Sequence, residues 1–222
     1  MLTLVVTRHG VTDRSHPEQH LGQTIDVPLN DAGRAQAEAL RHRLAAVRFE
    51  RVVSSPLLRA RETARILAGG THVELDARLL EMDYGRWEGL TYDELDRRYA
   101  AERAAWVRAP DVLACPDGES GFDVAERVGA FLVDLLRDHV RRHGSSADES
   151  DPVLLVAHSS TNRILVCLAL GLPIREYRQR LVQGQANLTV LRFEHGEGPT
   201  DARLLLLNDL AHLRSGDARP WD

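Results

Sequence analysis

The chain has 222 residues, of which 43% are hydrophobic and 27% are charged, and its formal net charge is −5. This length and composition fit one globular domain with its own core over residues 1–222, and the modest negative charge excludes a global field that would recruit nucleic acid or an anionic membrane. All 28 basic residues are arginine, which excludes a Walker A phosphate loop and Schiff-base chemistry, because both require lysine.

Short strands and helices alternate in the first third of the sequence. The β-branched run 2–7 predicts a strand buried on both faces. Asn30 is a candidate N-cap for a helix that carries Leu40, Leu44 and Val47 on one side. Three further elements are predicted in the order strand, helix and strand, over residues 51–54, 57–67 and 72–75.

The second half contains the strongest helix signal, over residues 119–143. Its apolar side chains recur at helical spacing, namely Val124, Val128, Phe131, Leu132, Leu135 and Leu136. After a polar loop at 145–150, a strand is predicted over 151–157, and a helix follows through Leu170. Two last strands are predicted near residues 188–193 and 203–207.

One stretch, at about residues 92–120, interrupts this alternation. Its pattern indicates helix and then a loop rich in proline and aspartate, which predicts a small helical cap insertion, and residues 214–222 form a short tail. Elsewhere the alternation of strands and helices favours an α/β fold. We therefore expect three layers, α/β/α, around a mainly parallel sheet.

The N-terminus and the cysteines predict a cytoplasmic protein. The first apolar run has no basic segment before it and meets Arg8 too early for a signal peptide. No stretch reaches the ~18 apolar residues of a membrane span. Cys115 and Cys167 are too few for a disulfide framework. With the net charge of −5, neither a membrane nor nucleic acid is expected as a partner.

Histidines and arginines follow three of the predicted strands. Arg8 and His9 follow the first strand, Arg59 lies one helical turn after the second, and His158 follows the strand at 151–157. In open α/β sheets ligands bind beyond the carboxyl ends of the strands. A single histidine at a strand end is more often a structural hydrogen-bonding group, but three strand ends that deliver histidine and arginine together favour a functional site.

The chemistry of such a site suits a phosphoryl group. Arginine offers a permanent charge and bidentate hydrogen bonds to phosphate oxygens, and the helix after His158 adds backbone N–H groups at its N-terminus. An electropositive site also disfavours a further positive charge on an imidazole. The neutral imidazole is the nucleophilic form that covalent catalysis by histidine needs.

Five sequence blocks then carry a resemblance to a known family. In order they are Leu4–Thr12, Asp26–Ala37, Ser54–Ala64, Leu80–Gly89 and Val153–His158. The chain resembles the histidine phosphatase superfamily, also called phosphoglycerate mutase-like, and in the Met82–Gly89 run it is similar to the phosphatase branch. The resemblance implies a metal-independent phosphomonoesterase of small phosphorylated metabolites, without a cofactor.

The resemblance also implies roles for individual residues. His9 attacks phosphorus and becomes phosphohistidine, Arg8 and Arg59 clamp the phosphoryl oxygens, His158 completes the clamp, and Glu81 protonates the leaving oxygen and later activates water. Glu88 has a structural role. Further substrate contacts are expected from Thr12, Ser15, Gly22, Gln23 and Ser159, although Ser15 replaces a frequent asparagine of the family. The polar run 159–163 either contacts the substrate or caps its helix.

Three alternatives stay open at this point. A phosphoglycerate mutase of the same family would use the same phosphohistidine. A metal-dependent hydrolase would use His9, His158 and Glu81 as ligands, but no tight spacing such as His-Glu-x-x-His supports it. A non-catalytic interaction module is disfavoured because all five expected catalytic residues are present. The partner expected is a small phosphorylated substrate, and a homodimer is left open.

Overall fold

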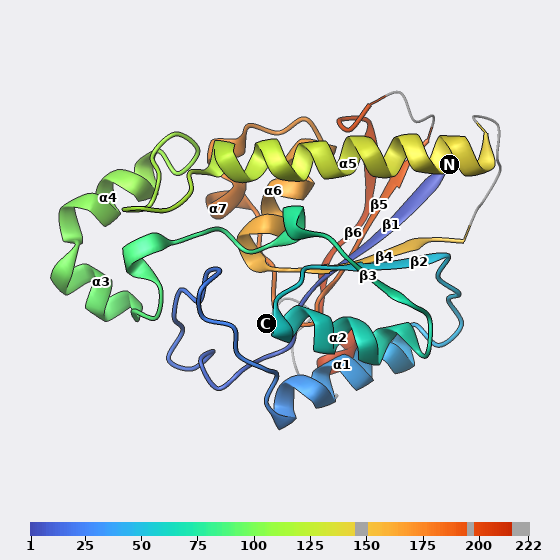
Figure 1. Cartoon of the computed structure of the whole chain (residues 1–222), viewed down its shortest axis with the longest axis horizontal. Helices are drawn as coiled ribbons and strands as arrows, with labels where there is room; N and C mark the ends of the chain where they lie inside the picture. The colour runs from blue at the N-terminus through green and yellow to red at the C-terminus, as the bar shows by residue number, and fades with distance from the viewer. Residues whose placement is uncertain (145–150, 195–197, 215–222) are drawn as a thin grey trace.

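A computed structural model describes residues 1–144, 151–194 and 198–214. The predicted polar loop at 145–150 and the predicted tail beyond residue 214 lie outside the described residues. Six strands form one sheet in the order β3-β2-β4-β1-β5-β6 (Figure 1). Their bounds are Leu2–Arg8 for β1, Arg51–Ser54 for β2, Val73–Leu75 for β3, Val153–Ala157 for β4, Leu188–Phe193 for β5 and Ala202–Asp209 for β6.

The sheet is mainly parallel, as the sequence predicts. β1, β2, β3 and β4 run parallel to one another, whereas β5 is antiparallel to both of its neighbours. β1 lies between β4 and β5, so that Val5 is paired with Leu154 on one side and with Val190 on the other. The first strand is therefore an inner strand of the sheet, and its expected burial on both faces is confirmed.

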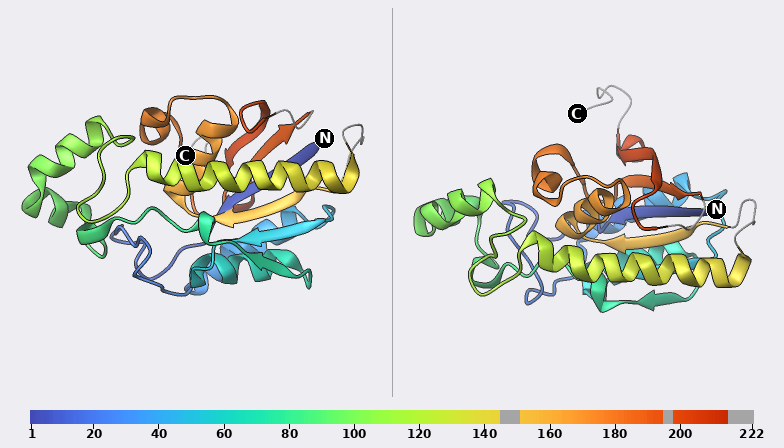
Figure 2. Two further views of the ribbon diagram at one scale, coloured as in Figure 1. Left: turned by 45° about the horizontal axis from the view of Figure 1, so that its top comes forward. Right: turned by 90° about the horizontal axis from the view of Figure 1, so that it is seen from above.

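Helices cover both faces of this sheet, which confirms the three-layer α/β/α architecture (Figures 1 and 2). α1 and α2 pack against one face, and α5 and α6 pack against the other. Their bounds are Asp31–Arg43 for α1, Leu58–Ala68 for α2, Gly121–His143 for α5 and Ser159–Ala169 for α6. A short helix, α7 at Tyr177–Arg180, follows α6.

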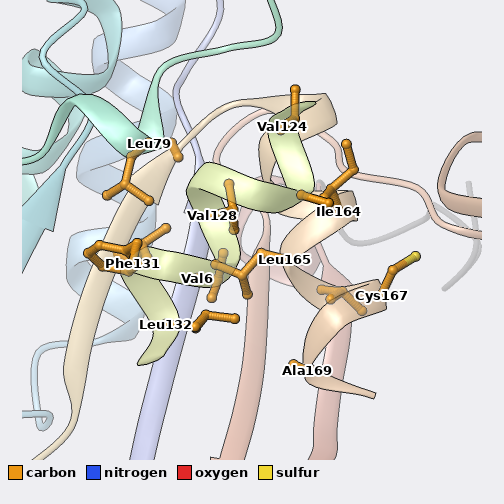
Figure 3. Close-up of a cluster of buried hydrophobic side chains, with 14 of the residues drawn as sticks. Val6, Leu79, Val124, Val128, Phe131, Leu132, Ile164, Leu165, Cys167 and Ala169 are labelled. Carbon is orange, nitrogen blue, oxygen red and sulfur yellow. The ribbon is translucent and has the colours of Figure 1, made fainter. Parts of the chain in front are cut away.

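The strands supply both halves of the core because successive side chains point to opposite faces. Val5 packs with α1 and α2, while Leu4 and Val6 pack with α5 and α6. In β4, Leu154 belongs to the first cluster and Leu155 to the second. Figure 3 shows the second cluster, where side chains of α5 and α6 meet: Val124, Val128, Phe131, Leu132, Ile164 and Leu165.

Local capping sets the helix boundaries and corrects two predictions. α1 begins after Asn30, whose side chain accepts the N–H of Gly33 at 2.9 Å, as expected. The helix ends at Arg43, so Val47 lies beyond it and is 37% exposed, because the chain turns back toward β2. α5 begins at Gly121 rather than at residue 119, because Ser120 and Asp123 form a capping box there.

The cap predicted at residues 92–120 consists of two short helices and a loop. α3 at Tyr92–Arg98 and α4 at Ala100–Arg108 lie at one end of the molecule, beyond the N-terminal end of α5 (Figure 1). Trp106 of α4 is buried and packs edge-on against Trp87 at 5.5 Å between ring centroids. Residues 16–25 run close to this insertion, since Gln19 forms a β-bridge with Thr91.

None of the helices in the described ranges combines the length and apolarity that a bilayer span requires.

Candidate active site

The residues that follow three strands lie together at one edge of the sheet, because β1, β2 and β4 are parallel and their carboxyl ends meet there. The ring centroids of His9, after β1, and His158, after β4, are 5.2 Å apart. His158 is fully buried beside His9. At this edge lies a cavity of about 270 Å³ whose lining includes four of the five predicted catalytic residues, Arg8, His9, Arg59 and Glu81.

His9 is held as a neutral imidazole in one tautomer. Its Nδ1 lies 2.7 Å from the carbonyl oxygen of Gly10. Because a carbonyl can only accept, Nδ1 donates and Nε2 carries the lone pair. Burial, and then the positive charges of Arg59 and Arg8, lower the pKa of His9 well below its ordinary value. The side chain is therefore a nitrogen nucleophile that needs no further deprotonation.

His158 is also neutral but is oriented by a different contact. Its Nε2 lies 2.8 Å from Oγ of Ser55, the residue that follows β2. Burial, and then the positive charge of Arg59, lower the pKa of His158 well below its ordinary value. When the Ser55 hydroxyl donates to Nε2, the imidazole proton sits on Nδ1, a buried atom without a partner among the described residues. That N–H is then a donor that no described residue satisfies, beside the ring of His9.

The two arginines of the predicted clamp are fixed by backbone carbonyl groups. Nη1 of Arg8 donates to the carbonyl of Gln183 at 3.0 Å. Nη1 and Nη2 of Arg59 donate to the carbonyls of Ile25 and Gly22 at 3.1 and 2.9 Å. Nε of each arginine is buried and has no partner in the described part of the chain. Each guanidinium group is thus held in place and retains a donor for a ligand.

The loop at residues 22–25 supports the site from outside the cavity lining. Gly22 has a φ of +55°, which favours glycine, and a Cβ there would lie 1.6 Å from Oε1 of Glu88 and would displace that carboxylate. Glu88 accepts the backbone N–H of Gln23 at 2.8 Å, which is the structural role expected of it. The amide of Gln23 donates to the carbonyl of Glu81 at 2.9 Å. Gly22 and Gln23 therefore act on Arg59 and Glu81, and their direct contact with substrate stays a prediction.

Glu81 lies in the cavity wall at the start of α6. Its carboxylate accepts the backbone N–H of Met82 at 3.0 Å and those of Ser160 and Thr161 at 3.4 and 3.3 Å. These donors orient the carboxylate, so the N-terminus of α6, which the sequence had suggested for phosphate, is occupied by Glu81. Nη2 of Arg127 donates to the Glu81 carbonyl at 3.1 Å. The backbone carbonyl of Glu81, the expected general acid, is thus held by both Gln23 and Arg127.

The remaining predicted substrate residues divide into two groups. Ser15 and Ser159 line the cavity. Thr12 is buried, and its backbone N–H donates to Oγ of Ser15 at 2.9 Å, so that it positions Ser15. In the polar run 159–163, Arg163 lines the cavity, while the Thr161 hydroxyl donates to the Leu80 carbonyl at 2.7 Å. The run therefore reaches the cavity as well as beginning the helix.

Sequence reasoning missed several residues of the cavity lining. Arg14 and Gln19 come from the loop after β1, Tyr84 and Tyr92 from the two sides of the cap junction, and Arg178 from α7. The Tyr84 side chain is fixed by a 2.8 Å hydrogen bond to Oγ of Ser160. Tyr92 and Arg178 follow no predicted strand, and Arg14 lies several residues beyond the end of β1, so position relative to the sheet did not reveal them. Only Tyr84, inside the Leu80–Gly89 block, carried a signal.

The described residues hold one cluster of side chains with ligand atoms close enough for a metal ion, and it is not at this site. Glu50, His139 and His143 place one ligand atom each within 4.8 Å of one another, beside the start of β2 and the end of α5. Glu50 is already engaged there, since its Oε2 lies 2.9 Å from Nε2 of His143 and Arg142 lies 3.9 Å from its carboxylate. His9, His158 and Glu81 are each engaged by the contacts given above.

The depressed pKa of His9 predicts an unusual pH dependence. An ordinary histidine, with a pKa of about 6.5, would protonate and stop reacting as the pH falls, whereas we expect kcat/KM to show no break from His9 between pH 7 and 5.5. The free energy of unfolding, unlike kcat/KM, should depend on pH in this range. Burial lowers the pKa of His20 to about 3 and those of His9 and His158 well below their ordinary value. These three histidines stay neutral in the folded protein but take up protons when it unfolds, so the free energy of unfolding falls as the pH drops below about 6.5.

The measurement is kcat/KM against pH for two esters whose own phosphate pKa values differ, with thermal unfolding followed at each pH. A break that moves with the ester belongs to the substrate. A break near pH 6.5 that stays in place for both esters, while the protein remains folded, would show that His9 titrates as an ordinary histidine.

Comparisons with known proteins agree with this arrangement. The profile of the histidine phosphatase superfamily (branch 1) matches residues 4–209. A glucosyl-3-phosphoglycerate phosphatase of Mycobacterium tuberculosis is 37% identical over 191 residues, which are 85% of this chain and 84% of the relative. A probable phosphoglycerate mutase, GpmB, of Enterobacter sp. is 32% identical over 96% of this chain and 95% of the relative. A solved structure of a mycobacterial glucosyl-3-phosphoglycerate phosphatase with VO3 is 32% identical, has a TM-score of 0.82, and is matched over 94% of this chain and 99% of that chain.

Proposed function

The chain belongs to the histidine phosphatase superfamily, and on this premise we propose that it hydrolyses monophosphate esters of small metabolites through a phosphohistidine on His9. One observation carries the proposal. A neutral His9 imidazole with an unprotonated Nε2 shares a cavity with two fixed guanidinium groups, those of Arg8 and Arg59, and with the carboxyl group of Glu81. A nucleophile, a clamp for phosphoryl oxygens and a proton donor are the parts that the reaction needs.

In the first half of the reaction, Nε2 of His9 attacks phosphorus. The N–P bond forms as the P–O bond to the alcohol breaks, and the leaving oxygen takes the proton of the Glu81 carboxyl group. Arg8 and Arg59 bind the non-bridging oxygens through charge-assisted hydrogen bonds, and their fixed charges stabilise the transferring group. Nδ1–H of His158 supplies a further donor.

In the second half, water replaces the alcohol. The Glu81 carboxylate, left without its proton, takes one from a water molecule as that water attacks phosphorus, and the N–P bond breaks. Inorganic phosphate leaves, and His9 returns to its neutral form with Nδ1 still donating to the Gly10 carbonyl. Protons balance over the cycle, because Glu81 gives one to the alcohol and recovers one from water.

Hydrolysis is favoured over phosphoryl transfer to a second metabolite by the Met82–Gly89 run, which resembles the phosphatase branch. A mutase must shield its phosphoenzyme from water until an acceptor binds. The mutase alternative draws support from the similarity to the probable phosphoglycerate mutase of Enterobacter sp.. A single domain, a cytoplasmic location and a homodimer stay predictions from the sequence. The two buried cysteines are free thiols, which is compatible with a cytoplasmic location.

The test is a panel of sugar phosphates, phosphoserine and phosphoglycerates assayed in EDTA, with free phosphate and 2-phosphoglycerate followed together. We expect phosphate release from at least one ester, unchanged by chelation. Bisphosphate-dependent conversion of 3-phosphoglycerate to 2-phosphoglycerate, with little free phosphate from any ester, would promote the mutase. Loss of turnover in EDTA that Zn²⁺ or Mg²⁺ restores would favour the metal-dependent hydrolase.

A further inference from the structure

We propose that Arg178 and Arg163 form a second anion-binding position in the cavity, which takes a carboxylate or second phosphate on the alcohol part of the substrate. The inference rests on the proposed function, because it assigns the part of the ester that His9 does not attack. It predicts that the enzyme prefers phosphomonoesters whose alcohol part is itself acidic.

The charge of the cavity is the first reason. Five arginines and two glutamates line it. Two of the arginines, Arg8 and Arg59, are the cations that lower the pKa of His9, and they suffice to hold one phosphoryl group. The others are Arg14, Arg163 and Arg178. One phosphoryl group therefore leaves positive charge in the cavity that a second anionic group would neutralise.

The second reason is that Arg163 and Arg178 have no ion-pair partner, since no carboxylate among the described residues lies within salt-bridge distance of either. Nε of Arg163 is buried and has no partner in the described ranges. Burial, and then the charge of Arg8, lowers the pKa of Arg163, as expected for a cation with neighbours of the same sign. By contrast Arg180, on the same short helix as Arg178, pairs with Glu176 at 2.9 Å.

The placement of Arg178 is the third reason. Its guanidinium carbon lies 4.3 Å from the centroid of the Trp106 ring, and Trp106 is buried in the cap helix α4. The stacked ring holds the guanidinium plane in position. The charge of Arg178 acts on His20, whose pKa it lowers after burial, and on Tyr84 and Tyr92. Arg178 thus serves the cap side of the cavity, whereas Arg8 and Arg59 serve the His9 side.

The first test compares 3-phosphoglycerate with glycerol 3-phosphate, which differ in one carboxylate replaced by a hydroxymethyl group. We expect wild-type enzyme to have the higher kcat/KM for the acid. Arg178→Met keeps an apolar stem against Trp106 and removes the charge; it should lower kcat/KM for the acid by about 10- to 100-fold, mainly through KM, the effect of losing a charge-assisted hydrogen bond. In the same variant, kcat/KM for glycerol 3-phosphate, whose alcohol part is uncharged, should change by less than about 2-fold. Arg163→Met should act in the same direction.

Arg180→Met is the matched control, since Arg180 lies on α7 but is not in the cavity lining, and it should leave both esters unchanged. Fructose 1,6-bisphosphate against fructose 6-phosphate tells whether a second phosphate takes the place of the carboxylate. Equal kcat/KM values of the wild type for the acidic and neutral members of both pairs would overturn the proposal. An equal loss on both members in Arg178→Met would also overturn it, because Arg178 would then only stabilise the cap. Release of phosphate from no ester would instead refute the phosphatase function itself.

Discussion

Replacing His9 with alanine should abolish the phosphoenzyme and lower kcat by on the order of 10⁶-fold, the scale seen when a hydrolase loses its nucleophile. The reason is geometric and electrostatic together. Nδ1 of His9 is committed to the Gly10 carbonyl, and burial with Arg59 and Arg8 keeps the ring neutral, so Nε2 is the atom prepared for attack. Rapid mixing with a phosphoester and a quench that avoids acid should yield a phosphorylated peptide containing Arg8-His9-Gly10.

The second histidine of the site and an exposed histidine complete this experiment. His158→Ala should slow labelling but leave the label on His9, because the proposed mechanism gives His158 a hydrogen bond to the phosphoryl group and no bond to phosphorus. His42→Ala, on the exposed part of α1, should label as wild type does. Label on a serine, an aspartate or His158 would end the phosphohistidine mechanism as written.

Replacing Glu81 with glutamine should reduce turnover of an alkyl phosphate by about 10²–10⁴-fold, the usual contribution of general acid–base catalysis. Glutamine keeps the shape of the side chain near the N–H groups of Ser160 and Thr161 but has no proton to give. An alkoxide leaving group needs that proton, whereas p-nitrophenolate leaves nearly unaided. Formation of the phosphoenzyme from p-nitrophenyl phosphate should therefore lose much less, as a rapid-quench comparison of the two esters will measure.

Glu18→Gln is the matched control, because Glu18 lines the same cavity and lies 3.9 Å from Arg8. It removes a carboxylate of the cavity without removing the acid, so any effect should be small and similar for both esters. Equal losses on the two esters in Glu81→Gln would show that Glu81 orients the site and does not protonate the leaving oxygen.

The sequence alone determined the layers of the fold and the centre of the site, for reasons that are local. Continuous apolar runs predict buried strands, and helical spacing of apolar side chains predicts α5, so the order of elements and the three-layer architecture follow. Arg8, His9 and His158 could be placed together because the carboxyl ends of parallel strands meet at one edge. Glu81 was identified through the resemblance, since a lone glutamate outside a strand end carries no local signal.

The tertiary structure decided everything that depends on contacts between distant segments. The close approach of Gly22 to Glu88 joins segments far apart in the sequence, and the N-terminus of α6 holds Glu81, a residue 79 positions before Ser160. Arg178 reaches the cavity by the same means, since α7 follows no catalytic strand and is placed by its packing against α6 and by the contact of Arg178 with Trp106 of the cap. Side chains of this kind leave no periodic or spacing signal, because their neighbours are set by how the elements pack and not by their order in the chain.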